Sequence, residues 1–279
     1  MTAPTRPVLR WHGGKWLLAP WIISHMPTHR VYVEPFGGAA SVLMRKPRAK
    51  SEVWNDLDGD LFNLFDVLRG PNAAAVIRAV SLTLFSRADF DLAYEPTDDP
   101  VERARRLLIR SHQGFGSNGA NQRTGWRSKG YRAGALPQHN WAAMPEVLSD
   151  VVERLRGVCI ERDDAREVMA RYDESDALHY VDPPYHFATR TDAGHDYAHE
   201  MSDDDHADLL AFLPTLKGKV MLSGYPHPQY DEALSDWTRI ERSALADGAS
   251  KRVEVLWCNF EGRQMDMFAA DTLHSGEQK

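Results

Sequence analysis

The chain has 279 residues, of which 43% are hydrophobic and 26% are charged, so it is large enough for one core or for a core with a smaller domain. Its two cysteines, Cys159 and Cys258, exclude a disulfide framework and predict a reducing, cytoplasmic location. No apolar run reaches the length of a membrane helix. The N-terminal segment MTAPTRPVLRWHGGK lacks the apolar region of a secretion signal, so we expect neither membrane insertion nor export.

The net charge of −7 is unevenly distributed along the chain. Residues 101–140 contain eight Lys or Arg and a single acid, Glu102, so this segment carries +7 and the remainder carries −14. A basic segment on an acidic body is typical of a protein that contacts a polyanion locally. The arginines from Arg103 to Arg110 can equally form the solvated face of a helix. The stretch after Gly114 has no helical pattern, and this favours a functional interpretation there.

Short apolar runs bounded by turn residues predict strands, which lie at residues 31–34, 52–55, 158–161, 178–182, 219–223, 238–242 and 252–259. Helical patterns separate most of them, and this alternation predicts an α/β fold with a mostly parallel sheet. The last two runs are joined by SALADGASK, which is too short for a crossover helix. They therefore predict an antiparallel hairpin at the edge of the sheet.

The helical patterns and one long connection define the expected domains. Residues 57–68 carry an apolar stripe, and Ser202 with Asp205 forms a capping box at the start of another helix. Metal binding by residues 203–206 is an alternative, but capping already explains these acids. About 100 residues separate the second and third strands, far more than a crossover helix needs. We expect a sheet domain and an inserted subdomain followed by a frayed tail, at residues 1–69 with 151–270, 70–150 and 271–279, respectively.

The stretch YVEPFGGAAS, residues 32–41, is a strand followed by a glycine turn and a helix start. Gly37 and Gly38 permit a ligand to approach the backbone closely, although the dinucleotide pattern G-x-G-x-x-G is absent. Asp56 follows the second strand about 20 residues later, where an acid can accept hydrogen bonds from ribose hydroxyls. Asp56 can equally be the N-cap of the helix that follows. The nearby RWHGGKW is not a P-loop, because Trp16 follows Lys15.

The sequence Asp182-Pro183-Pro184-Tyr185 follows the fourth strand, and its two prolines end the strand stiffly. An exocyclic amine on an aromatic ring is a poor nucleophile, since its lone pair is delocalised into the ring. The Asp182 carboxylate and the Pro183 carbonyl can hold the two N–H groups of such an amine, and Tyr185 can stack on the ring. A plain strand-ending turn with a buried tyrosine is the alternative.

These motifs in this order resemble the alpha-class adenine-N6 DNA methyltransferases, which include bacterial enzymes that methylate GATC and many phage relatives. The matching features are Trp-x-Gly-Gly-Lys, Glu-Pro-Phe-x-Gly, Asn-Asp, a basic insertion and Asp-Pro-Pro-Tyr, over roughly residues 8–260. EVLWCNF, residues 254–260, resembles the final strand of the family. The resemblance implies a Rossmann-like methyltransferase fold and S-adenosylmethionine as methyl donor, with no metal.

The resemblance also implies site residues. Catalytic roles at a flipped-out adenine fall to Asp182, Pro183 and Tyr185. Cofactor contacts fall to Trp11, Lys15, Glu34, Phe36, Gly37, Gly38, Asp56 and Asp182. Relatives often have another glycine where this turn reads Gly37-Gly38-Ala39-Ala40, and we expect alanine to be accommodated there only with a negative φ.

The insertion is then the expected target-recognition region for double-stranded DNA, with basic residues on phosphates and Asn, Gln or Arg on base edges. The expected DNA-binding residues are Asn118, Gln122, Arg123, Trp126, Arg127, Lys129, Tyr131 and Arg132, and Asn121 is of a base-reading type. Phe115, Trp126 or Tyr131 is expected to wedge into the gap left by the flipped base.

Several alternatives stay open at this point. Cytosine-N4 methylation uses the same chemistry, but relatives acting on cytosine more often carry Ser in place of Asp182. Cytosine-C5 methylation needs a nucleophilic Cys, usually after Pro, and neither cysteine has that context. RNA or protein-amide methylation favours Asn at that position. A DNA-binding regulator on a retired methylase fold is the rival from another class. The expected protein is a monomer or homodimer, located at a bacterial nucleoid or in a phage-infected cell.

Overall fold

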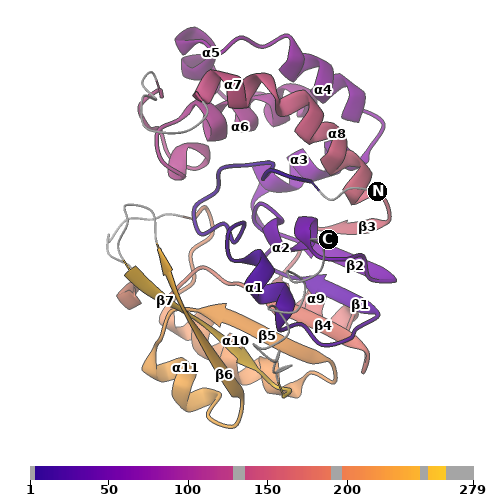
Figure 1. The fold of residues 1–279 in the computed structure, drawn as a ribbon, viewed down its shortest axis with the longest axis vertical. Coiled ribbons are helices and arrows are strands. Elements are labelled where there is room, and N and C mark those ends of the chain that lie inside the picture. The colour runs from indigo at the N-terminus through magenta and orange to yellow at the C-terminus, as the bar shows by residue number, and fades with distance from the viewer. Residues whose placement is uncertain (1–3, 128–135, 190–196, 246–250, 262–279) are drawn as a thin grey trace, which may run out of the picture.

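The computed structural model describes residues 4–127, 136–189, 197–245 and 251–261. Seven strands within these residues form one sheet of order β3-β2-β1-β4-β5-β7-β6 (Figure 1). Their bounds are β1 Val31–Glu34, β2 Ser51–Asn55, β3 Val158–Glu161, β4 Ala177–Val181, β5 Lys219–Gly224, β6 Thr238–Leu245 and β7 Lys251–Cys258. The neighbours from β3 to β5 are parallel, whereas β7 pairs antiparallel with both β5 and β6. The predicted α/β sheet with its antiparallel edge hairpin is confirmed.

Each face of the sheet is covered by a different set of helices because side chains alternate along a strand. Tyr32 and Tyr180 lie in the larger core cluster with residues of α1, α2 and α3. Val181 and Leu222 point to the other face, where they pack with residues of α9, α10 and α11. These helices are α1 Ala19–Ser24, α2 Ser41–Arg45, α3 Gly59–Arg69, α9 Ala165–Arg171, α10 Asp203–Phe212 and α11 Pro228–Ala233. The result is a layered α/β arrangement with helices on both faces of the sheet, as the resemblance implied.

The chain between β2 and β3 builds a group of helices at one end of the molecule, above the sheet in Figure 1. They are α4 Ala73–Ser81, α5 Arg87–Leu92, α6 Pro100–Gln113, α7 Pro137–Ala142 and α8 Met144–Leu155. Helix α6 packs against α3, α4 and α5, and α8 packs against α3 and α4. Short 3-10 turns complete the secondary structure, at Asn118–Ala120, Phe187–Thr189 and Leu213–Thr215.

Two details differ from the sequence-based boundaries. Helix α3 begins at Gly59 and not at residue 57, because Asp58 is its N-cap and accepts hydrogen bonds from the backbone N–H groups of Asp60 and Leu61. The boundary placed at residue 150 falls inside α8, which continues to Leu155. The expected frayed tail at residues 271–279 lies outside the described residues.

Candidate active site

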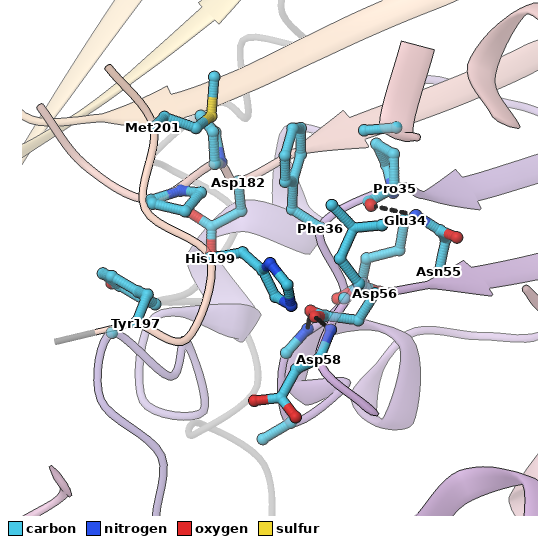
Figure 2. A pocket seen from close by; sticks show the side chains of 18 of the residues that line it. Glu34, Pro35, Phe36, Asn55, Asp56, Asp58, Asp182, Tyr197, His199 and Met201 are labelled. Carbon is cyan, nitrogen blue, oxygen red and sulfur yellow. Dashed lines mark hydrogen bonds between the residues drawn. The ribbon is translucent and has the colours of Figure 1, made fainter. Parts of the chain in front are cut away.

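A pocket opens at the carboxyl ends of β1, β2 and β4 (Figure 2). Strands β1 and β4 are neighbours in the sheet, and the chain leaves them toward opposite faces. Ligands of open α/β sheets bind at such a switch point. Its lining includes the expected cofactor residues Trp11, Lys15, Glu34, Phe36, Gly37, Gly38, Asp56 and Asp182. The structure therefore brings together residues from four motifs that are far apart in the sequence.

The glycine turn after β1 has an unusual backbone. Gly38 has a φ of +48°, and Ala40 has a φ of +55°, which makes Ala40 the non-glycine residue with a positive φ in the described part of the chain. The expectation of a negative φ for alanine in this turn is therefore wrong at Ala40. A side chain at Gly37 would overlap the Trp54 ring, at 2.0 Å from Nε1, so this glycine is needed for packing.

Asp56 is bound into the pocket floor by two backbone N–H groups. Its Oδ2 accepts a hydrogen bond from Gly38 at 2.8 Å, and its Oδ1 accepts one from Asp58 at 2.9 Å. Burial raises the pKa of Asp56 to about 6, against the opposing effect of these two hydrogen bonds. Because Asp58 caps α3, the alternative of Asp56 as the helix N-cap is excluded, and its carboxylate faces the pocket.

Glu34 lines the pocket, but its hydrogen bonds point into the protein. Oε2 accepts from the Tyr32 hydroxyl and from the backbone N–H of Leu43, both at 3.0 Å. Ala40, the N-cap residue of α2, has no side chain that can satisfy a helix N–H, so Glu34 supplies that acceptor from the end of β1. Burial raises the pKa of Glu34 to about 8. Glu34 therefore supports the wall of the pocket from behind.

Lys15, Asp182 and Tyr185 form a compact cluster. Lys15 Nζ lies 2.9 Å from Asp182 Oδ1 and 4.5 Å from the centroid of the Tyr185 ring. Burial lowers the pKa of Lys15, but Asp182 and Glu254 outweigh it and hold this pKa above its usual value. The ring of Tyr185 is thus a face that accepts a cation beside a carboxylate.

Residues that the sequence analysis missed hold this cluster from β5 and β7. Ser223 donates to Asp182 Oδ1 at 2.7 Å and shares a hydrogen bond of 3.1 Å with the Tyr180 hydroxyl. Tyr185 donates its hydroxyl hydrogen to Glu254 Oε2 at 2.8 Å. The only sequence signal for Glu254 was its place in the motif EVLWCNF.

A segment after the DPPY motif closes the pocket from the side, and sequence reasoning missed it as well. Tyr197, His199 and Met201 line the pocket, and His199 points toward Asp56 (Figure 2). Tyr197 packs tightly on the N-terminal motif: a Cβ added to Gly13 would lie 2.4 Å from its hydroxyl oxygen. No periodic pattern precedes these residues, so the sequence offered no local signal for them.

The arginines of α6 are occupied by ion pairs within the protein. Arg103 and Arg110 both bind Asp60, and Arg105 and Arg106 both bind Glu102. Arg105, Arg106 and Arg110 are only 13–15% exposed, so these arginines form an internally paired helix face and not the solvated face that was the expected alternative. These arginines therefore hold the insertion together through ion pairs, and they do not form a row of unpaired cations on α6.

The loop after α6 is folded back on itself. Gly114 and Trp126 form an isolated bridge, and Trp126 Nε1 donates to Gln113 Oε1 at 3.4 Å. The Trp126 ring also packs on Phe85, with ring centroids 5.4 Å apart. Trp126 therefore anchors the loop, whereas Phe115 is 72% exposed.

The structure describes some of the remaining expected DNA-binding residues and not others. Asn118 begins the 3-10 turn, Asn121 and Arg127 are partly buried, and Gln122 is exposed. Arg123 is exposed and lies 3.5 Å from Asp91. Three others lie outside the described residues, namely Lys129, Tyr131 and Arg132.

Two further properties concern the described residues alone. No group of three or more His, Cys, Asp or Glu among them could hold a metal ion, and Ser202 with Asp205 forms the expected capping box. No described helix combines the length and apolar character needed to cross a bilayer.

Fold and site together define an α/β protein with a ligand pocket at the switch point of its sheet and an Asp-Pro-Pro-Tyr motif on the pocket's rim. The sequence matches the D12 class N6 adenine-specific DNA methyltransferase family over residues 11–247, and the chain therefore belongs to that family.

Individual relatives support the same assignment. The chain is 27% identical to the DNA adenine methylase of Vibrio cholerae over 191 residues, which cover 64% of this chain and 65% of the relative. It is 23% identical to the DNA adenine methylase of Salmonella typhi over 262 residues, which cover 88% of this chain and 92% of the relative. The DNA adenine methylase of Escherichia coli K12 gives the same identity and coverage.

Proposed function

We propose that this chain transfers a methyl group from S-adenosylmethionine to N6 of an adenine flipped out of a short motif in duplex DNA. The observation that carries the proposal is the position of Asp182, which borders the pocket floored by Asp56 and lies beside the Tyr185 ring. One carboxylate is thereby close to both a cofactor-sized pocket and an aromatic stacking face.

The groups in the pocket fit S-adenosylmethionine. Asp56 has carboxylate oxygens for ribose hydroxyls, and Trp11 and Phe36 supply aromatic surface for a purine. Asp182 supplies negative charge for an ammonium group. When bound, this cofactor supplies an electrophilic methyl group on a sulfonium centre.

The residues of this chain supply positioning and electrostatics in the reaction. Asp182 and the Pro183 carbonyl accept the two N–H groups of the target amine, which directs the nitrogen lone pair toward the methyl donor. Tyr185 stacks on the base. Asp182 also stabilises the positive charge that N6 carries until it releases one proton to water. Neutral cytosine N4 fits the same chemistry, and the base is identified by the experiment below.

The inserted loop is the proposed DNA contact. Phe115 is our candidate for the wedge, because it is exposed while Trp126 is packed in the loop. The other proposed contacts are Asn118, Asn121, Gln122, Arg123, Arg127, Lys129, Tyr131 and Arg132. Since the proposed substrate is intracellular DNA, the proposed location is the cytoplasm, at a nucleoid or in a phage-infected cell. The active unit is a monomer or a homodimer.

The decisive experiment expresses the chain in a host that lacks adenine methylation and maps modified bases in the host DNA. N6-methyladenine at one short motif is the expected result. Asp182→Ala is expected to lower the methylation rate by about 10²–10³-fold while DNA affinity is retained. Asp176→Ala, at an exposed aspartate one strand-length earlier, is the control and should leave the rate unchanged. Modified cytosine would correct the base, and unmodified DNA with no cofactor binding would instead favour the DNA-binding regulator.

A further inference from the structure

The hydroxyl of Tyr185 is hydrogen-bonded to a buried acid, Glu254. It donates to Glu254 Oε2 at 2.8 Å, across 69 positions of the sequence. Both residues are 7% exposed. Glu254 belongs to β7, next to Val255, which pairs with Gly224 of β5. The hydrogen bond thus ties the turn after β4 to a strand beyond β5.

An acid is a costly residue for this position. Burying a carboxyl group is unfavourable unless it is paired, and the following residues Val255, Leu256 and Trp257 are apolar and fully buried. Burial raises the pKa of Glu254, and the nearby Lys15 opposes this effect. A tyrosine hydroxyl at the edge of a pocket could instead be hydrogen-bonded to water. The presence of an acid therefore calls for a specific reason.

The geometry around Tyr185 supplies that reason. Tyr225 meets its ring edge-on, with centroids 4.6 Å apart and planes 73° apart, and Glu254 fixes the hydroxyl end. One face of the ring lies toward Lys15 Nζ, which is paired with Asp182. The Lys15 ammonium occupies this face in the structure, and an amino-bearing ring bound by Asp182 would take its place there. Because accepting a hydrogen bond from the phenol makes the ring richer in electrons, Glu254 also strengthens its attraction for positive charge.

We propose that Glu254 is a positioning residue for methyl transfer, which holds the Tyr185 ring in place to stack on the target base and on the positive charge that develops at its amine. This inference rests on the proposed function and deepens it. Its hydrogen bond goes to Tyr185 and its charge also acts on Lys15, so Glu254 is assigned a positioning role and not a catalytic one.

A double-mutant cycle on the full chain tests the proposal. Single-turnover methylation of a duplex oligonucleotide is measured for the wild type, Glu254→Ala, Tyr185→Phe and the double variant. Each single variant should be about tenfold slower, and the double variant should be no more than about twofold slower than either single one, since both remove the same interaction. Glu254→Gln keeps an acceptor and should recover most of the rate.

A second Tyr–Glu pair, which joins the end of α9 to β3, provides a matched control. Tyr172 donates to Glu161 Oε1 at 2.7 Å, outside the pocket. Tyr172→Phe and Glu161→Ala should leave the single-turnover rate unchanged. Affinity for S-adenosylmethionine and the thermal unfolding midpoint are measured for every variant, and the positioning role leaves that affinity unchanged.

The outcomes separate the two proposals. A wild type that transfers no methyl group overturns the proposed function and this inference with it. An active wild type whose Glu254 and Tyr185 effects multiply, or whose rate is insensitive to Glu254→Ala, overturns the inference alone. If Glu254→Ala does not fold, Tyr185→Phe decides: a tenfold slower rate with unchanged cofactor affinity supports the proposal, and an unchanged rate overturns it.

Discussion

Asp56 and Asp182 both follow strands of the same sheet, but their partners give them different properties. Asp56 accepts two backbone N–H groups, whereas Asp182 accepts the Lys15 ammonium and the Ser223 hydroxyl. Burial raises the pKa of Asp56 to about 6, and its two hydrogen-bond donors are backbone N–H groups and not cations. Its protonation therefore changes within the range in which enzymes are assayed.

This pKa predicts a pH-dependent cofactor affinity. If ribose hydroxyls donate to Asp56, the ionised form binds better, so affinity should fall by up to about tenfold per pH unit below pH 6 and level off above it. The folded-state pKa lies above the unfolded value, so the free protein should also lose stability as pH rises from about 4 to about 6.

Calorimetric titration of S-adenosylmethionine from pH 5 to pH 8 measures this dependence. Asp56→Asn should bind more weakly and show a flattened profile. Asp66→Asn, at an exposed aspartate of α3 outside the pocket, should keep the wild-type profile. A pH dependence that persists unchanged in Asp56→Asn would refute the assignment.

A second residue-scale prediction concerns Phe115, which is 72% exposed in the loop after α6. Phe115→Ala should weaken binding to duplex DNA by about tenfold, because stacking of an aromatic side chain on a base contributes about 1–3 kcal/mol. It should also reduce the fluorescence gain of 2-aminopurine at the target position, which reports base flipping. Leu92→Ala, 46% exposed on α5, is the control. Equal effects of the two substitutions would argue against a wedge at Phe115.

At the scale of the element, helix α2 begins under backbone strain. Its N-cap residue, Ala40, has a left-handed conformation with φ 55° and ψ 31° and makes no side-chain cap. Such a conformation costs an alanine about 1–2 kcal/mol relative to the right-handed region. Glu34 compensates by accepting the Leu43 N–H, so the turn persists with an alanine where glycine is the favoured residue.

Two glycine substitutions in this turn test that strain. Ala39→Gly should lower the free energy of unfolding by about 1–2 kcal/mol, through the lost methyl group and the greater freedom of the unfolded chain. Ala40→Gly should cost about 1–2 kcal/mol less, because it also relieves the positive φ. Urea unfolding of the two variants measures the difference. Equal losses would mean that Ala40 carries no strain.

The elements themselves were largely predictable, because their signals are local. Each apolar run bounded by turn residues became a strand of the sheet, and the Ser202–Asp205 capping box predicted the start of α10. The start of α3 was wrong because Asp56 and Asp58 are both good capping residues, and only the backbone conformation decides between them. The predicted negative φ failed for a similar reason: the strain at Ala40 is tolerated through a distant side chain.

At the scale of the whole molecule, a buried ion cluster joins the inserted helices to the sheet. Arg154 of α8 binds both carboxylate oxygens of Glu52 on β2 and donates to the Leu43 carbonyl. Lys46 Nζ reaches the same carboxylate at 2.8 Å. Although burial opposes it, Arg154 and Lys46 hold the pKa of Glu52 below its usual value.

Loss of the central carboxylate should therefore be severe. Glu52→Gln leaves two buried cations without their counter-charge and should lower the free energy of unfolding by about 3–5 kcal/mol. Glu153→Gln, on the surface of the same helix as Arg154, should cost less than about 1 kcal/mol. Denaturant unfolding at pH 7 compares them. A loss below about 1 kcal/mol for Glu52→Gln would show that the cluster adds little to stability.

The site was less predictable than the fold because its contacts span the chain. Motif order located the pocket, and its expected lining residues do meet there. Tertiary packing produces the hydrogen bond between Tyr185 and Glu254, and it also places His199 in the pocket. No residue spacing in the sequence predicts either feature. For Trp126, the sequence showed an aromatic residue in a basic loop but could not say whether it is exposed. Its packing on Phe85 in the structure identifies it as an anchor of the loop and not as an exposed wedge.

The insertion leaves the sheet at the end of β2 and returns to it at β3, and these two strands are paired neighbours. The inserted helices are therefore connected to the sheet at two adjacent points, the end of β2 and the start of β3. If the loop in this insertion contacts DNA as we propose, exchange of the insertion between related genes should alter the DNA sequence that is selected, without disturbing β1, β4 or the pocket between them. The Glu52–Arg154 ion pair joins the insertion to the sheet at that junction. An insertion taken from a relative would therefore have to supply an equivalent of Arg154.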